Sequence, residues 1–358
     1  MSRFHELKVK RVKRETNDCV SLSFEVPEGI KEEFTFNQGQ FLTFKKTLDN
    51  GEEIRRSYSI CSAPHEGELS VAVKHVRNGI FSTYANTLVK EGDVLEAMPP
   101  SGRFMGKFSA GTQKEYLAIA AGSGITPVIS IIKTILQTQP DSSVHLLYGN
   151  KDRNSIIFKE QLESLKNKYL GRLSLYFILS RETADAAMFS GRINKEKIAN
   201  LFKYFLPANN ISEAFLCGPE EMILEVKDYL LANGLQPGRV HFELFAAAGA
   251  QKTFGQQTQG EASHELANVA VTLDGSTVSL TMPYDGESIL DAAMRNGADL
   301  PYACKGGVCA TCRAKLLKGK VHMDVAYGLE PEELAAGFIL TCQSHPRSAE
   351  IAVNFDIK

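Results

Sequence analysis

Four of the seven cysteines stand in the last 55 residues, and their spacing constrains the fold more than any other feature of the chain. Three lie on one short loop and the fourth follows after 29 further residues, at Cys304, Cys309, Cys312 and Cys342. Four thiolates in this C-x4-C-x2-C arrangement with a remote fourth are typical of a [2Fe–2S] cluster, in which each iron takes two. Gly306 and Gly307 allow the loop to bend and bring peptide N–H groups near the sulfurs. A structural zinc site instead favours two C-x2-C pairs, and the chain has one.

Composition excludes several other classes of protein. The 358 residues suffice for two or three domains, and 40 basic against 42 acidic residues leave no surplus for binding nucleic acid or an anionic membrane. No apolar run reaches the roughly 18 residues of a membrane span, and Met1–Arg14 is charged, without a signal-peptide core. We therefore expect a cytoplasmic protein. Cys19 and Cys61 are expected to be small buried side chains.

Hydrophobic periodicity divides the chain into blocks. Residues 1–108 show short alternating stretches between polar turns, which predict an antiparallel β-barrel or a sandwich. Residues 109–245 alternate apolar strands with helical segments, which predicts a parallel α/β sheet. Residues 246–263 are small and polar and are expected to form a linker. Residues 264–358 combine a hairpin at Asp274-Gly275, a helix and further strands in an α+β domain.

The cysteine loop carries a family resemblance. The segment PYACKGGVCATCRAKLLKG, together with TCQSHP, is similar to the ferredoxin module of class-I oxygenase reductases. The resemblance implies a ubiquitin-like β-grasp fold for residues 264–358.

Arg56-Ser57-Tyr58-Ser59 is expected to stand at the start of a short strand. An arginine can pair with a phosphate, a tyrosine can stack on a flavin ring and a serine can hydrogen-bond a ring nitrogen. By itself the motif also fits ordinary barrel residues. It resembles the R-x-Y-S of the ferredoxin–NADP reductase superfamily, which implies bound FAD. In that superfamily the arginine contacts the pyrophosphate, the tyrosine packs on the ring and the second serine approaches flavin N5.

A second segment resembles the other flavin-binding segment of that superfamily. The implied FAD-binding residues are Val73, Lys74, His75, Gly79, Phe81, Ser82 and Thr83. Ser82 and Thr83 are equally suited to cap a short helix that begins at Tyr84. Lys74 and His75 also fit a solvated strand end.

Two glycine-containing turns are candidates for a nicotinamide site. The turn Gly122-Ser123-Gly124-Ile125-Thr126-Pro127 follows a strand and opens a helix, where a pyrophosphate is favoured. It is not G-x-G-x-x-G, but resembles the superfamily's own GxGxTP. Cys217-Gly218-Pro219 resembles its C-G-P motif, which lies near the carbon that loses hydride. Each segment alone also fits a plain strand-to-helix turn.

Nucleotide preference rests on fewer residues. Ser180, Arg181 and Arg192 are candidates to hold a 2′-phosphate, whereas Glu182 would suit an unphosphorylated ribose, so NADPH is favoured over NADH. The final His241–Phe245 segment resembles the E-x-F end of related reductases, which implies that Glu243 and Phe245 lie beside the flavin. The candidate catalytic residues are Tyr58, Ser59, Cys217 and Glu243.

The motif order is similar to that of oxygenase reductases, and the stretch from CKGGVC through LEPEELAAGFILTCQSHPRS most specifically resembles those of phenylacetyl-CoA oxygenase (epoxidase) systems. This resemblance implies electron flow from NADPH or NADH through FAD and a [2Fe–2S] cluster to a separate di-iron oxygenase. Ketosteroid 9α-hydroxylase reductases share the layout, so the oxygenase served stays open. An iron–sulfur flavoprotein that only senses redox state is a further alternative.

Overall fold

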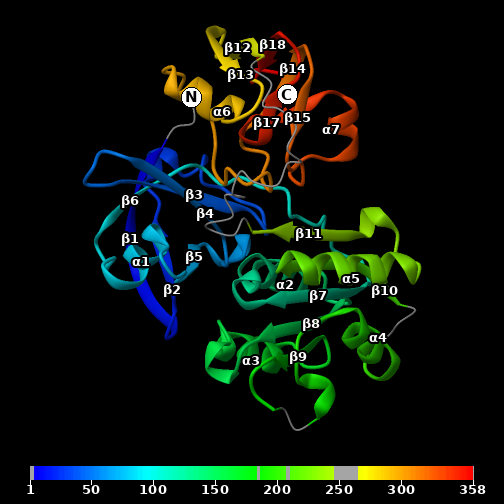
Figure 1. The fold of residues 1–358 in the computed structure, drawn as a ribbon. Coiled ribbons are helices and arrows are strands. Elements are labelled where there is room, and N and C mark those ends of the chain that lie inside the picture. Colours follow the sequence, from blue (N-terminus) through cyan, green and yellow to red (C-terminus); the bar gives the residue numbers. More distant parts are fainter. Residues whose placement is uncertain (1–3, 184–185, 207–209, 246–264, 358) are drawn as a thin grey trace. The chain divides into compact units, whose positions relative to one another are not determined.

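The computed structural model describes residues 4–183, 186–206, 210–245 and 265–357. The chain forms two compact units, one over Phe4–Phe245 and one whose described part is residues 265–357 (Figure 1). The predicted linker at 246–263 lies outside the described residues. None of the described helices is both long and apolar enough to cross a bilayer.

An antiparallel sheet begins the larger unit (blue to cyan in Figure 1). Its strands are β1 (His5–Thr16), β2 (Cys19–Glu25), β3 (Phe41–Thr47), β4 (Glu53–Ser59), β5 (Leu69–Lys74) and β6 (Val94–Ala97). They pair in the order β4-β3-β6-β1-β2-β5. A bridge between Ile60 and Val71, and a hydrogen bond from the Cys61 N–H to the Ser70 carbonyl, join the two edges. The sheet therefore closes into the predicted barrel.

Two local expectations in the barrel are wrong. The Arg56–Ser59 motif ends strand β4 instead of starting a strand, because β4 begins earlier, at Glu53. The helix expected from Tyr84 is α1 (Ile80–Thr87), and Gly79 precedes it. Ser82 and Thr83 therefore lie inside the first turn, where both hydroxyls donate to the Gly79 carbonyl at 3.1 and 2.7 Å.

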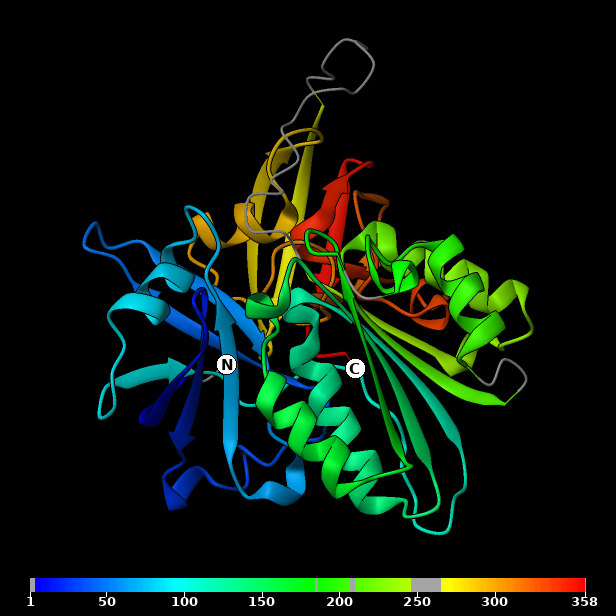
Figure 2. The same cartoon turned by 90° about the horizontal axis from the view of Figure 1, so that it is seen from below.

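Five parallel strands follow the barrel, as predicted. They are β7 (Glu115–Ala121), β8 (Ser143–Asn150), β9 (Leu173–Leu179), β10 (Ile211–Gly218) and β11 (Val240–Leu244), in the order β11-β10-β7-β8-β9. Helices α2 (Ile125–Thr138) and α3 (Lys159–Lys168) cover one face, and α4 (Lys195–Tyr204) and α5 (Glu220–Ala232) the other (Figure 2). The strand order reverses between β7 and β10. Open sheets of this kind bind ligands at the carboxyl ends of the strands beside such a reversal.

Buried polar contacts join α2 to the barrel. Lys133 is only 5% exposed. Its amine donates to a carboxylate oxygen of Glu66 at 3.0 Å and to the carbonyl of Cys61 at 3.3 Å. The hydroxyl of Ser130, one helical turn earlier, donates to the carbonyl of Ser62 at 2.7 Å. These bonds fix the position of α2 against the barrel within the same unit.

The second unit has a mixed sheet with the order β13-β12-β18-β14-β16. Its strands are β12 (Leu266–Leu273), β13 (Ser276–Pro283), β14 (Arg313–Lys318), β16 (Phe338–Leu340) and β18 (Glu350–Asn354), and β15 (Val321–Met323) pairs separately with β17 (Ser344–Pro346). Asp274 and Gly275 form the predicted hairpin turn with φ of +50° and +72°. Helix α6 (Ile289–Arg295) begins after Ser288, whose hydroxyl accepts the Asp291 N–H, and α7 (Pro331–Ala335) is shorter.

Short 3₁₀ segments connect these elements. They are η1 (Glu28–Ile30), η2 (Pro64–Glu66), η3 (Gly122–Gly124), η4 (Arg153–Ser155), η5 (Ala187–Phe189), η6 (Pro237–Arg239) and η7 (Thr341–Gln343). Two of them matter for function, because η3 opens helix α2 and η7 carries Cys342.

The close packing of Gly39 gives a stability test. A Cβ at this position would lie 1.8 Å from the carbonyl oxygen of Phe104, so Gly39→Ala forces the backbone apart. Gly111→Ala is the control, because Gly111 has a similar φ of +75° but no atom within 4 Å of an added Cβ. We expect Gly39→Ala to cost about 1–3 kcal/mol more of unfolding free energy than the control. Equal thermal unfolding of the two variants, followed by circular dichroism, would contradict this close approach of the two segments.

Candidate functional site

Three residues far apart in the sequence meet where the barrel joins the parallel sheet. Ser59 ends β4, and its hydroxyl donates to a carboxylate oxygen of Glu243 on β11 at 3.3 Å. Cys217 on β10 is the register partner of Glu243, so both side chains leave the sheet on the same face. Ser59 and Cys217 are almost fully buried. The fold thus brings three of the four candidate catalytic residues together.

These groups are uncharged at neutral pH. Burial raises the pKa of the Glu243 carboxyl to about 8, and the hydrogen bond from Ser59 opposes this shift only in part. Burial also raises the pKa of the Cys217 thiol well above its usual value, and the nearby Glu243 adds to the effect. Glu243 and Cys217 therefore keep their protons at pH 7.

Tyr58, the fourth candidate, is held by aromatic neighbours. Its ring lies 5.5 Å from the ring of Phe81 at an interplanar angle of 33°, and Phe81 stacks on Phe44 at 5.7 Å. Phe81 is 1% exposed, so it supports the Tyr58 ring from the barrel core. Arg56 is exposed and donates to the carbonyl of Arg55 at 2.7 Å.

The remaining predicted flavin residues form local contacts. The Ser57 hydroxyl pairs with that of Thr43 at 3.0 Å, and Val73 lies in the barrel core. The ring of His75 contacts the Thr83 hydroxyl at 3.2 Å. A Cβ on Gly79 would lie 2.5 Å from the Ser82 hydroxyl, so a larger residue here would displace that side chain. The structure leaves the flavin roles of these residues as predictions.

A cavity of about 650 Å³ lies at the carboxyl ends of the parallel strands. Predicted site residues that line it are Lys74, Gly122, Ser123, Ser180, Arg192, Gly218, Pro219 and Phe245. Lys74 of the flavin segment, glycines of both nicotinamide turns and two of the three 2′-phosphate candidates therefore share one cavity. Arg181 is exposed and does not line it.

The predicted glycines have different tasks. Gly122 has φ of +54°, and the nearest atom to an added Cβ would be the Lys74 amine at 3.9 Å, so its backbone is open to the cavity. A Cβ on Gly124 would lie 2.1 Å from the carbonyl oxygen of Cys217, so Gly124 lets the turn pack directly on β10. Thr126 and Pro127 are buried in α2, and the Thr126 hydroxyl donates to the Ser123 carbonyl at 3.0 Å.

Asn150 and Lys151 are among the residues of this cavity that sequence reasoning missed. Both stand at the carboxyl end of β8, and a parallel strand end is itself a signal for a ligand edge. The side-chain oxygen of Asn150 is buried and has no hydrogen-bond partner among the described residues. A ribose hydroxyl or an adenine amino group would satisfy this acceptor. The cavity's size, cations and unpaired acceptor fit a dinucleotide.

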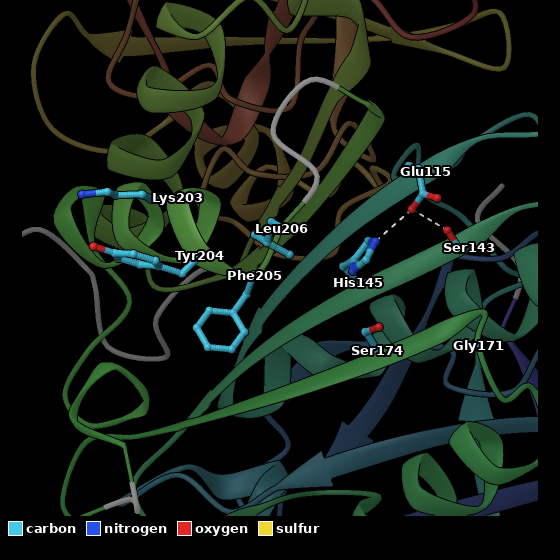
Figure 3. A pocket seen from close by; sticks show the side chains of 9 residues that line it. All are labelled: Glu115, Ser143, His145, Gly171, Ser174, Lys203, Tyr204, Phe205 and Leu206. Atoms are coloured by element: carbon cyan, nitrogen blue, oxygen red, sulfur yellow. Dashed lines mark hydrogen bonds and ion pairs between the residues drawn. The ribbon is translucent and has the colours of Figure 1, made fainter.

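A second hollow, of about 470 Å³, lies at the amino ends of strands β7, β8 and β9, opposite the first cavity (Figure 3). The Glu115 carboxylate accepts hydrogen bonds there from Ser143 and from His145, the latter at 2.8 Å. Phe205 and Leu206, at the end of α4, form part of the wall. None of the residues predicted from the sequence lines it.

In the second unit, the four predicted iron ligands form two pairs. The Cys309 thiol donates a hydrogen bond to the Cys304 sulfur, which lowers the pKa of Cys304 to about 6. The Cys312 thiol donates to the Cys342 sulfur, which raises the pKa of Cys312. Within the described ranges, no group of three His, Cys, Asp or Glu side chains surrounds a single metal position. Two thiolate pairs fit a [2Fe–2S] cluster, in which each iron takes one pair.

The backbone of the loop supports this arrangement. The Gly306 N–H donates to the Cys304 sulfur at 3.3 Å, and the chain turns at Lys305 and Gly307, with φ of +49° and +70°. The Gly328 N–H donates to the Gly307 carbonyl at 2.9 Å and ties the loop to a neighbouring segment. The predicted bend and the predicted N–H···S contact are both present.

Family models match three parts of the chain. An oxidoreductase FAD-binding domain matches residues 6–105, an oxidoreductase NAD-binding domain 118–228 and a 2Fe-2S iron-sulfur cluster binding domain 271–347. The chain is 46% identical to a component of the 1,2-phenylacetyl-CoA epoxidase of Escherichia coli over 100% of this chain and 99% of that protein. The chain belongs to the oxygenase reductase family. It is therefore an NAD(P)H-dependent oxidoreductase that uses FAD and a [2Fe–2S] cluster.

Other members of the oxygenase reductase family are similar over nearly the whole length. The ferredoxin reductase component of 3-ketosteroid-9-alpha-monooxygenase from Rhodococcus rhodochrous is 34% identical over 98% of this chain and 96% of that protein. Phthalate dioxygenase reductase has a similar fold, with a TM-score of 0.59 at 22% identity and 98% of both chains covered. Relatives that serve different oxygenases place an oxygenase among this chain's partners.

The raised pKa of Glu243 predicts a pH-dependent stability. The unfolded carboxyl loses its proton near pH 4.5 and the folded one near pH 8, so folding stability falls as pH rises between these values. Glu243→Gln removes this proton, and its stability relative to the unchanged protein is expected to increase across that window. Thermal unfolding of FAD-loaded protein from pH 4.5 to 9 measures the difference. Parallel profiles for the two proteins would contradict the burial of an ionisable carboxyl.

Close packing at Gly328 predicts sensitivity of cluster loading. A Cβ there would lie 2.5 Å from the carbonyl oxygen of Cys309, so Gly328→Ala displaces the loop that carries three sulfurs. We expect a clear loss of iron per chain, measured by metal analysis together with visible absorption. Gly297→Ala is the control, because alanine is strained at its φ of +89° but the added Cβ meets nothing within 4 Å. Equal iron content in both variants would argue against this role of Gly328.

Proposed function

We propose that this protein takes electrons from NAD(P)H and passes them singly to a di-iron oxygenase that epoxidises phenylacetyl-CoA. The observation that carries the proposal is the presence in one chain of the Ser59–Glu243–Cys217 group beside a nucleotide-sized cavity and of two cysteine pairs. The residue group and its cavity suit hydride transfer, and the cysteine pairs suit single-electron transfer. The similarity to a component of 1,2-phenylacetyl-CoA epoxidase supports the choice of oxygenase.

The proposed organisation follows the sequence blocks. Residues 1–108 bind FAD, residues 109–245 bind the nicotinamide nucleotide and residues 264–358 bind the cluster, with a linker at 246–263. The three matched family domains fall inside these bounds and support them. We place the protein in the cytoplasm, where thiols such as those of its seven cysteines, none of which forms a disulfide, stay reduced.

When bound, the three cofactors supply a hydride donor, a carrier that exchanges two electrons for single ones, and a one-electron carrier. The chain's own residues bind and orient them. Gly122 and Ser123, in the η3 turn that opens α2, direct N–H groups toward the nucleotide pyrophosphate, and Lys74 adds a positive charge. Gly218 and Pro219 give a surface without bulky side chains on which the nicotinamide lies.

Barrel residues hold the flavin. Tyr58 packs on the ring system, and its own orientation is fixed by Phe81. Arg56 is exposed and free to turn toward the pyrophosphate, whose other neighbours are the turn at Gly79 and the hydroxyls of Ser82 and Thr83. A rigid aromatic support of this kind keeps the two reacting rings in one geometry, which lowers the entropic cost of reaction.

Glu243 holds a proton at the reaction end of the cavity, because burial keeps its carboxyl protonated at pH 7. The Ser59 hydroxyl donates to an oxygen of that carboxyl and so orients it. The Cys217 thiol stays neutral and packs beside them. Uncharged neighbours avoid a fixed negative charge next to a group that becomes more negative on reduction.

A variant of one cysteine separates reduction of the protein by NADPH from electron delivery to the oxygenase. Cys342→Ser removes one ligand and is expected to abolish electron delivery to the oxygenase component, while NADPH-dependent ferricyanide reduction persists. The assay measures phenylacetyl-CoA consumption with purified oxygenase, and flavin and iron contents are checked in parallel. Support of a ketosteroid oxygenase but not of the phenylacetyl-CoA enzyme would reassign the partner. FAD- and iron-loaded protein that neither NADPH nor NADH reduces would favour a redox-sensing role.

A further inference from the structure

The segment Ser180-Arg181-Glu182 contains both a cationic and an acidic candidate for the ribose end of the nucleotide. In the structure, both oxygens of the Glu182 carboxylate are bound by the same residue. The Arg153 guanidinium contacts one oxygen at 2.8 Å, and the Arg153 backbone N–H donates to the other at 2.9 Å. Charge-assisted bonds to each oxygen fix the direction of the carboxylate and neutralise it.

The cavity takes its ribose-end side chains from neighbouring positions. Lys151, Ser180 and Arg192 line it, and neither Arg153 nor Glu182 does. Two other carboxylates, Glu221 and Glu225, line the cavity from the first turns of α5, and the Glu225 carboxylate accepts the Lys195 N–H at 3.0 Å. Glu182 is thus next to the cationic lining in sequence but does not take part in it.

The same contact ties two loops together. The N–H groups of Ser180 and Arg181 donate to the carbonyls of Asn150 and Lys151 at 2.9 and 2.8 Å, which extends the pairing of β8 and β9 beyond the strand ends. The Asp152 carboxylate accepts the Ser155 N–H at 2.9 Å and shapes the following turn. Arg153 and Glu182 add a side-chain link between the loops that carry Lys151 and Ser180.

We propose that Arg153 is a positioning residue for nucleotide choice. It holds the Glu182 carboxylate out of the cavity, so that the end lined by Lys151, Ser180 and Arg192 favours a nucleotide with a 2′-phosphate. A free carboxylate at this place would accept a bond from an unphosphorylated ribose and repel a phosphate. The inference rests on the proposed nicotinamide site and adds its selectivity.

The test compares Arg153→Ala with a matched control, Arg11→Ala. The Arg11–Glu68 pair is also 2.8 Å long, with arginine and glutamate side chains 56% and 31% exposed, against 58% and 33% for Arg153 and Glu182. Calorimetric titration of the FAD-loaded full chain with 2′,5′-ADP and with ADP measures binding without turnover. Ferricyanide reduction then gives kcat and KM for NADPH and NADH.

We expect the unchanged protein to bind 2′,5′-ADP more tightly than ADP. Arg153→Ala should lower this preference about tenfold, equivalent to about 1.4 kcal/mol. The change should appear in the Kd values of 2′,5′-ADP and ADP and in the KM values of NADPH and NADH, with little change in kcat. The double variant Arg153→Ala/Glu182→Gln should restore most of the preference, because the freed carboxylate is then absent. Arg11→Ala should leave it unchanged.

Three results would overturn the inference. They are equal binding of 2′,5′-ADP and ADP by the unchanged protein, an unaltered preference in Arg153→Ala, and a double variant that does not recover. If Arg153→Ala does not fold, the single variant Glu182→Gln tests the inference instead. We expect it to keep the preference for 2′,5′-ADP over ADP. A large loss of that preference would overturn the inference, because it would show that the Glu182 carboxylate itself supports binding of the phosphate. Failure of both NADPH and NADH to reduce the protein would instead count against the proposed function, because the calorimetric comparison needs no turnover.

Discussion

The arrangement of the larger unit depends on the hydrogen bonds that the buried amine of Lys133 makes to the barrel. A charged amine that is 5% exposed must be paired, and its partners are the Glu66 carboxylate and the Cys61 carbonyl of the barrel. Helix α2 can therefore pack on the barrel in one position only. Because α2 follows β7 and packs on β10, this position also determines where Cys217 and its neighbour Glu243 lie relative to Ser59.

Charge is distributed unevenly around the site that this packing creates. The residues that meet at the barrel junction, Ser59, Cys217 and Glu243, are neutral at pH 7 because burial keeps their protons in place. The basic residues Lys74, Lys151 and Arg192 line the cavity that fits the nucleotide. Binding energy from an anionic ligand thus comes from groups separate from those at the reaction end, so each set can change without the other.

Sequence patterns predicted the parallel sheet best, because several of its buried strands, such as β7, are continuous apolar runs. They missed β1, since Leu7 and Val9 alternate with charged residues in a segment that reads as polar. Four thiolates, two for each iron, followed from ligand number, whereas the structure shows which cysteines pair. No local pattern encodes the geometry of the loops. That geometry determines the direction of Arg181, the lining role of Lys151 and the contact of Arg153 with Glu182.

The two cysteine pairs differ in the length of chain that each must close. Cys304 and Cys309 are separated by four residues, whereas Cys312 and Cys342 enclose 29, including β14, β15, α7 and β16. Closing the short loop costs little entropy, but the long one is held closed only once those elements have folded. The first half of the metal site can form early in folding and the second only late. Iron uptake therefore reports whether the C-terminal unit is complete, and a chain damaged in this region would lack the cluster and could not pass electrons through this unit.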